Sequence, residues 1–152
     1  MLPTFDENGL LPPGIHVADT WQEFASRFGQ TSHRQSLLLG MKSALGVLRQ
    51  ARCQMVYVDG SFVTSREHPD DFDVCWDTTG VDGDQLKQLA PLLLKVDKGG
   101  WDAQKLKYRG KFFPTQVIEG GSGKVFLEFF QIDKTTGNHK GIVALKLREI
   151  WS

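Results

Sequence analysis

The sequence predicts a single α+β domain in which a small mixed β-sheet is covered by helices. Residues 55–58 (MVYV) form an apolar run with the length and β-rich composition of a buried strand. Residues 71–77 (DFDVCWD) alternate polar and apolar side chains, which is typical of a strand with two different faces. Residues 32–51 instead place apolar side chains three and four positions apart, which predicts an amphipathic helix packed on that sheet.

Length and charge are those of an ordinary globular protein. The chain has 152 residues, which suits one domain with one core, and its 18 basic residues balance its 18 acidic ones. This balance gives no general argument for a nucleic acid or a membrane as partner. No apolar stretch approaches the length of about 20 residues that a membrane span requires, and the first residues lack the features of a signal peptide. We therefore expect a cytoplasmic protein without a membrane partner, with Cys53 and Cys75 as reduced thiols.

The N-terminal half predicts an arm and two helices. Residues 1–18 are rich in proline and glycine and predict an extended arm over the surface, followed by a single domain over residues 19–152. Thr20 is expected to cap a short helix that ends at about Phe28, and Ser32 to cap the longer helix. The polar face expected for the longer helix carries Arg34, Lys42, Arg49 and Gln50.

Two further helices are expected after the alternating strand. Asp82 or Asp84 caps the first of them, and Pro91 kinks it or divides it in two because proline removes a backbone hydrogen bond. Residues 101–111 predict a short helix that ends at Gly110.

The C-terminal third predicts further strands. Residues 112–119 and 124–132 each resemble a strand, and the glycine-rich residues 120–123 predict a hairpin turn between them. Residues 142–147 fit a last strand or a short helix equally well.

Two carboxylates on the alternating strand are the main candidates for chemistry. Asp71 and Asp73 are two residues apart, so their side chains project side by side on one face. Two such carboxylates repel each other unless a proton or a cation intervenes. Mg²⁺ suits this arrangement because it binds one or two carboxylates together with substrate phosphate oxygens. Just upstream, Gly60 and Ser61 predict a tight turn whose backbone can approach a phosphate, or else a plain turn at the end of a strand.

The spacing of these residues resembles a known motif. Gly60-Ser61, nine intervening residues and then Asp71-Phe72-Asp73-Val74 is similar to the motif of the DNA polymerase β-like nucleotidyltransferase superfamily. Residues 60–77 and 129–143 (FFQIDKTTGNHKGIV) also resemble a family of short, poorly characterised bacterial and phage-borne proteins with that fold. The resemblance implies a nucleotidyltransferase-like fold with Mg²⁺ or Mn²⁺ as cofactor. It also implies transfer of a nucleotide from an NTP, ATP in the first place, to a hydroxyl group on RNA, protein or a small molecule.

The resemblance also implies a third acidic group on a neighbouring strand. Glu128 is our candidate for this catalytic and metal-binding role, because it is a lone carboxylate in the apolar run 124–132, where an unpaired charge is costly. A solvated Glu128 on an edge strand is the alternative, and Asp133 is the second choice as the third acid. Arg66 is placed to bind the triphosphate, although a solvated arginine is the simpler interpretation.

A second function is also consistent with the sequence. The same fold could serve as a catalytically silent binding protein, such as an antitoxin or a phage-defence regulator. This alternative arises because no helical domain that would bind a nucleobase follows the acidic strands. The basic residues between Lys95 and Lys111 could contact RNA, but a solvated face is the simpler interpretation because acidic residues interrupt them.

Overall fold

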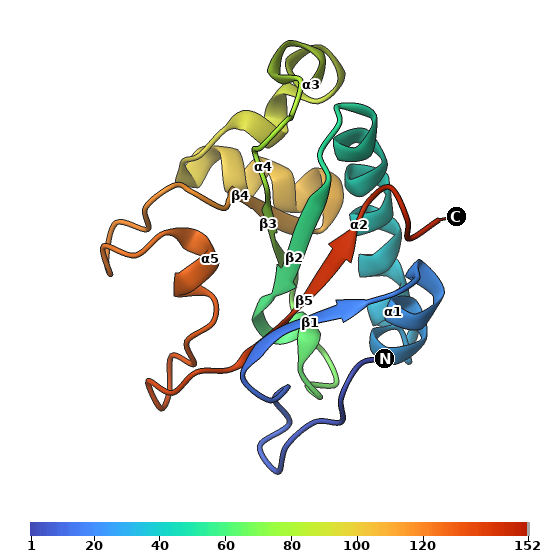
Figure 1. The fold of residues 1–152 in the computed structure, drawn as a ribbon, viewed down its shortest axis with the longest axis vertical. Helices are drawn as coiled ribbons and strands as arrows, with labels where there is room; N and C mark the ends of the chain where they lie inside the picture. Colours follow the sequence, from blue (N-terminus) through green and yellow to red (C-terminus); the bar gives the residue numbers. More distant parts are fainter. Residues whose placement is uncertain (152) are drawn as a thin grey trace.

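The computed structural model describes residues 1–151 and confirms the α+β class (Figure 1). Its centre is a five-stranded mixed sheet with the strand order β1-β5-β2-β3-β4. The strands are β1 (Gly14–Ala18), β2 (Met55–Asp59), β3 (Phe72–Trp76), β4 (Gly110–Pro114) and β5 (Gly141–Lys146). The pairs β1–β5 and β3–β4 are parallel, whereas β2 runs antiparallel to both β3 and β5.

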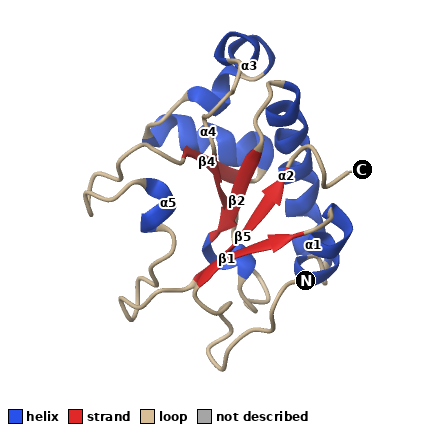
Figure 2. Ribbon diagram, viewed as in Figure 1, coloured by secondary structure: helices blue, strands red, loops and turns tan. Residues whose placement is uncertain are grey.

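Helices surround this sheet, as the colouring in Figure 2 makes clear. The α-helices are α1 (Trp21–Phe28), α2 (Ser32–Gln50), α3 (Gly83–Leu89), α4 (Lys98–Tyr108) and α5 (Phe126–Phe129). Two short 3₁₀ helices, η1 (Gly60–Val63) and η2 (Pro91–Leu94), complete the set. Among residues 1–151, no helix has the length and apolar character needed to cross a membrane.

The two faces of the sheet are covered differently. One face packs on α1 and α2 and forms the main core, in which Val58 and Val74 of the sheet are buried with Met41 of α2. The other face carries a smaller aromatic cluster that includes Phe113 of β4 and Phe126 of α5. Figure 1 shows α5 and its flanking loops on the side of the sheet away from α1 and α2. This second face holds the candidate site.

The N-terminal predictions are confirmed in part. The Thr20 hydroxyl accepts a hydrogen bond from the backbone N–H of Glu23, which confirms the cap of α1. The cap of α2 is Thr31, one residue before the predicted Ser32. The expected surface arm is wrong for residues 14–18, because they form the edge strand β1, which pairs with β5.

The later helices follow the sequence more closely. Asp82 caps α3, and Pro91 begins the separate helix η2, so the predicted division at this proline is confirmed. The helix predicted over 101–111 is α4, which ends at Tyr108 and is capped by Arg109 in the left-handed conformation (φ 73°) rather than by Gly110. Residues 141–146 form the strand β5, so the segment for which the sequence allowed a strand or a short helix is a strand.

The strand predicted over residues 124–132 is wrong. Its centre forms α5, and the strand predicted over 112–119 is the shorter and earlier β4. Phe126 and Phe130 are four residues apart, and as neighbours on a helix they both pack on Phe113 with ring centroids 4.7 and 4.9 Å away. A run of mostly apolar residues fits a strand and a helix alike, and here the tertiary contacts select the helix. The turn predicted over 120–123 is confirmed, because Ile118 and Val125 form an antiparallel bridge and the N–H groups of Glu119 and Phe126 donate to the carbonyls of Lys124 and Val117; only the strands around it are shorter than predicted.

Candidate active site

A sharp backbone bend follows β2 at Gly60. Gly60 has φ 77°, in the left-handed region that favours glycine, and a Cβ atom at this position would lie 2.5 Å from Asp73 Oδ2. Thr64 closes the bend by donating its hydroxyl to the carbonyl of Ser61 at 2.6 Å. Glycine is therefore what allows the backbone to approach the Asp73 carboxylate, and the tight turn predicted at Gly60-Ser61 is confirmed.

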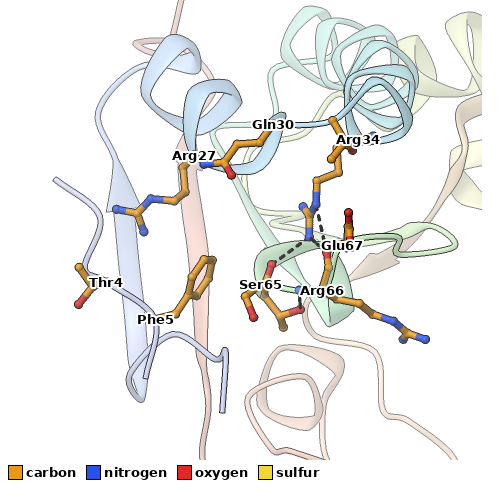
Figure 3. A pocket seen from close by; sticks show the side chains of 10 residues that line it. Thr4, Phe5, Arg27, Gln30, Arg34, Ser65, Arg66 and Glu67 are labelled. Atoms are coloured by element: carbon orange, nitrogen blue, oxygen red, sulfur yellow. Dashed lines mark hydrogen bonds between the residues drawn. The ribbon is translucent and has the colours of Figure 1, made fainter. Parts of the chain in front are cut away.

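A buried arginine from α2 holds the loop after the bend. The Arg34 side chain is 5% exposed, and its guanidinium donates to four backbone carbonyls, those of Phe28, Phe62, Thr64 and Arg66. Figure 3 shows Arg34 reaching from α2 towards the loop of Ser65 and Arg66. The expected solvent-facing position of Arg34 is thus wrong. Its partners are mostly about thirty residues away in sequence, so no local pattern reveals them.

The alternation predicted for residues 71–77 is confirmed. Its apolar members are buried in the main core: Phe72, Val74 and Trp76. Asp73 lies on the other face, opposite Asp59 of β2 and opposite Lys111 of β4. Residues directly opposite each other on neighbouring strands project to the same face, so these three side chains share one small volume.

Asp71 joins this group from just before β3. Its half-buried carboxylate has Oδ2 3.8 Å from Lys105 Nζ and 4.0 Å from Lys111 Nζ. The charge on Asp71 also raises the pKa of Asp73. The structure therefore brings the two predicted aspartates close enough to interact, with two lysines as neighbouring cations.

Burial and charge act together on Asp73. Burial is the main cause that raises its pKa to about 7, and the charge on Asp71 is the second. Lys111, Lys134 and Lys140 act in the opposite direction and lower the pKa. At neutral pH the Asp73 carboxyl therefore exchanges readily between its neutral and its charged form, and a bound cation would favour the charged one.

Asp59 of β2 also belongs to this cluster, although it was not among the expected site residues. It is fully buried, its Oδ2 accepts a hydrogen bond from Cys75 Sγ at 3.5 Å, and its Oδ1 has no hydrogen-bond partner. Burial, followed by the charge on Asp73, raises the pKa of Asp59 well above its usual value. The sequence feature that could have identified Asp59 as a site residue is its position between the buried run 55–58 and Gly60.

The bend and Asp73 open onto a cavity of about 410 Å³, which we call the Gly60 cleft. Arg66, Lys134 and Lys140 supply positive charge to its lining. The full lining consists of Leu10, Gly60, Ser61, Thr64, Arg66, Asp73, Phe129, Phe130, Ile132, Asp133, Lys134 and Lys140. The predicted residues Gly60, Ser61 and Arg66 are thus brought together with Asp73. The lysines were not predicted, although both lie in the segment 129–143 that carried the family resemblance.

Glu128 does not join the aspartates. It is exposed on α5 and is absent from the lining of the Gly60 cleft, because the segment is helical and turns this side chain outwards. Asp133, the second choice, does line the cleft together with Asp73. It accepts hydrogen bonds from the hydroxyl and the backbone N–H of Thr136, and the hydroxyl bond is the main cause that lowers the pKa of Asp133.

The donor atoms of Asp71 and Asp73 suit a magnesium or manganese ion. Within residues 1–151, no three His, Cys, Asp or Glu side chains are grouped as a metal site. Mg²⁺ nevertheless needs only one or two protein carboxylates when substrate phosphates and water complete its shell. Behind Asp73, the Oδ1 atom of buried Asp59 is a polar atom without a hydrogen-bond partner. The residues present therefore fit a cation that arrives together with a phosphorylated substrate.

Comparison with known proteins identifies a family. A family model described as "Family of unknown function (DUF6932)" matches residues 3–146. Neither the curated proteins nor the solved structures contain a significant match to the chain. The family description does not mention nucleotidyl transfer, so the resemblance to the nucleotidyltransferase superfamily stays a prediction. Because the match spans nearly the whole chain, the protein belongs to DUF6932, a family of unknown function.

Proposed function

We propose that the Gly60 cleft binds the triphosphate of an NTP with Mg²⁺, and that the protein transfers the nucleotide to a hydroxyl acceptor. The observation that supports this proposal is the glycine bend pressed against the Asp73 carboxylate in a cleft that also presents Arg66, Lys134 and Lys140. A backbone bend and a set of cations suit phosphate oxygens, and a carboxylate beside them suits the accompanying metal ion.

The polar side chains at the cleft have separate roles in this proposal. Asp73 in the cleft and Asp71 beside it hold the metal, and the Ser61 hydroxyl with the cations binds the phosphates. When bound, the metal stabilises charge on the entering and leaving oxygens of an in-line displacement. The acceptor oxygen bonds to the α-phosphorus and pyrophosphate leaves. Asp133 is our candidate for the base that takes the hydroxyl proton, because it is the other carboxylate lining the cleft.

Isothermal titration with each NTP, in Mg²⁺ and in EDTA, tests the binding step. We expect binding in Mg²⁺ that Asp73→Asn weakens by about tenfold or more, because one metal ligand is lost. Asp77→Asn is the matched control, since Asp77 directly follows β3 and lines a different cavity. Its affinity should stay close to that of the wild type. An absence of NTP binding, or equal effects of both substitutions, would contradict the proposal.

Incubation with α-³²P-labelled NTPs and total cell lysate tests the transfer step. A covalently labelled RNA, protein or small molecule is expected with the wild type and is expected to be lost with Asp73→Asn. The labelled molecule would also identify the acceptor class.

One observation favours the second candidate, a catalytically silent nucleotide-binding protein with the same cleft. Lys111 lies directly opposite Asp73 and close to Asp71, so the protein supplies a cation of its own beside both carboxylates. Under this alternative, NTP binds equally well in EDTA and no lysate component becomes labelled. Under this alternative, Lys111→Met would weaken NTP binding. Under the enzyme proposal, NTP binding by Lys111→Met would instead depend more strongly on Mg²⁺ than NTP binding by the wild type.

A further inference from the structure

A second cavity, of about 570 Å³, adjoins the Gly60 cleft between β4, α4 and α5. We call it the Trp101 cavity. Unlike the cleft, its lining is mainly aromatic and aliphatic: Asp73, Val96, Trp101, Lys111, Phe113, Ile118, Glu119, Gly120, Phe126, Phe129, Phe130 and Lys134. The two cavities share the side chains of Asp73, Phe129, Phe130 and Lys134. Asp73 therefore stands at their junction.

The aromatic walls are held in fixed positions. Trp101 donates its indole N–H to the Phe112 carbonyl at 3.1 Å, and its ring lies 5.0 Å from the ring of Phe113. Phe126 of α5 meets Trp101 edge-to-face at 6.0 Å. In Figure 1, α4 and α5 flank the end of the sheet at β4, so helices from both sides build this wall. Such a preformed apolar wall favours a flat ring as its occupant.

The mouth of the Trp101 cavity is also apolar. Ile118 is 62% exposed and Val96 is 37% exposed, and both line the cavity. These two side chains extend the apolar lining of the cavity to the surface, where a ligand ring can cover them. The polar groups at the same site, among them Glu119 and the backbone at Gly120, can accept or donate hydrogen bonds at the edge of such a ligand.

We propose that the Trp101 cavity receives the nucleobase of the NTP whose phosphates lie in the Gly60 cleft. This inference rests on the proposed function. The charged phosphates suit the cation-lined cleft, and the uncharged ring suits the aromatic cavity. The shared wall at Asp73 and Phe129 lets one nucleotide extend from one cavity into the other. A volume of about 570 Å³ is also within the range of small-ligand pockets. Trp101 of α4 and the segment between β4 and β5 thereby supply base recognition without a separate helical domain.

Comparison of an NTP with inorganic tripolyphosphate tests this assignment. In Mg²⁺ we expect the wild type to bind its preferred NTP about tenfold or more tightly than tripolyphosphate, because only the NTP gains base stacking. Ile118→Ser at the exposed mouth should reduce this ratio by about threefold or more and leave tripolyphosphate affinity unchanged. Leu106→Ser is the control, since Leu106 is an exposed aliphatic residue of α4 outside the cavity. It should leave the ratio unchanged.

Tryptophan fluorescence provides an independent readout. The NTP should change the emission of the wild type, tripolyphosphate should not, and Trp101→Phe should lose most of the change. Equal binding of both ligands, with a ratio that Ile118→Ser does not alter, would overturn the base assignment and leave the phosphate cleft intact. A weakening of both ligands by Ile118→Ser would likewise overturn it. If neither ligand binds, the proposed function itself fails.

Discussion

The close approach of Gly60 to Asp73 links backbone conformation to the chemistry of a single carboxylate. Gly60→Ala would force a side chain into the left-handed region and against Asp73 Oδ2, which lies 2.5 Å from the new Cβ position. We expect the free energy of unfolding to fall by about 2 kcal/mol or more, and Mg²⁺-dependent NTP binding to be lost. Urea unfolding and titration calorimetry measure the two effects.

Gly46→Ala is the matched control for this prediction. Gly46 lies in α2, and a Cβ atom there meets nothing within 4 Å. Alanine should stabilise the helix by about 0.5–1 kcal/mol and leave binding unchanged. Equal behaviour of the two variants would show that the bend is not constrained as described.

The raised pKa of Asp73 predicts how stability depends on pH. The folded protein holds the Asp73 proton up to a pKa of about 7, whereas the usual value is 3.8, so the folded state binds more protons between these values. The free energy of unfolding should therefore fall as pH rises from about 4 to about 7, and the loss is complete above pH 7. Asp73→Asn removes this loss. We expect the variant to be more stable than the wild type by about 2 kcal/mol at pH 8, and similar to it near pH 4.

Urea unfolding in EDTA at several pH values measures this effect. Some pH dependence should remain in Asp73→Asn, because the pKa of buried Asp59 is also raised. Asp77→Asn serves as the control, and we expect it to gain no comparable stability at pH 8. A variant that is destabilised equally at every pH would contradict the electrostatic explanation.

At the scale of secondary-structure elements, Arg34 joins α2 to the loop that follows η1. Arg34→Met leaves buried carbonyl groups, including those of Phe62 and Thr64, without their donor. We expect the free energy of unfolding to fall by about 3 kcal/mol, because each unsatisfied buried group is costly. Arg49→Met on the exposed face of the same helix should cost less than about 1 kcal/mol. Chemical denaturation of the two variants tests the difference.

The position of α5 predicts that Glu128 is not needed for NTP binding. Because Glu128 is exposed and does not line the Gly60 cleft, Glu128→Gln should keep Mg²⁺-dependent NTP binding close to that of the wild type. The same calorimetric titration that tests Asp73→Asn measures this variant. A loss of NTP binding as large as that of Asp73→Asn would contradict this prediction and indicate that Glu128 takes part in binding.

The elements differ in how far the sequence could predict them. The alternation of residues 71–77 identified β3 and the shared face of Asp71 and Asp73, because a strand with two different faces has a period of two. The helix α5 could not be predicted, because a short apolar run fits either structure and only its contact with Phe113 decides. The roles of Arg34 and Lys111 were hidden for a similar reason. Each depends on partners brought close by the tertiary fold rather than by spacing along the chain.

At the scale of the whole molecule, the N-terminal segment belongs to the main core. Leu11 is 1% exposed and is part of that core, so this residue fixes the segment that was expected to extend over the surface. Leu11→Ala should lower the free energy of unfolding by about 3 kcal/mol, as for other buried leucines. Leu39→Ala, at a residue that is 73% exposed, should change it by less than about 0.5 kcal/mol. Thermal or urea unfolding of the pair distinguishes a core segment from an arm.

The strand order has a consequence for synthesis of the protein. β5 lies between β1 and β2, yet it is synthesised after the other four strands of the sheet. Until it emerges, β1 has no partner in the sheet and β2 exposes one edge, so the nascent chain carries unpaired strand edges for most of its synthesis. Pairing of β5 with β1 and β2 joins segments far apart in sequence, and such non-local pairing is intrinsically slow. A nascent chain of this kind is a natural client for chaperones that shield open strand edges.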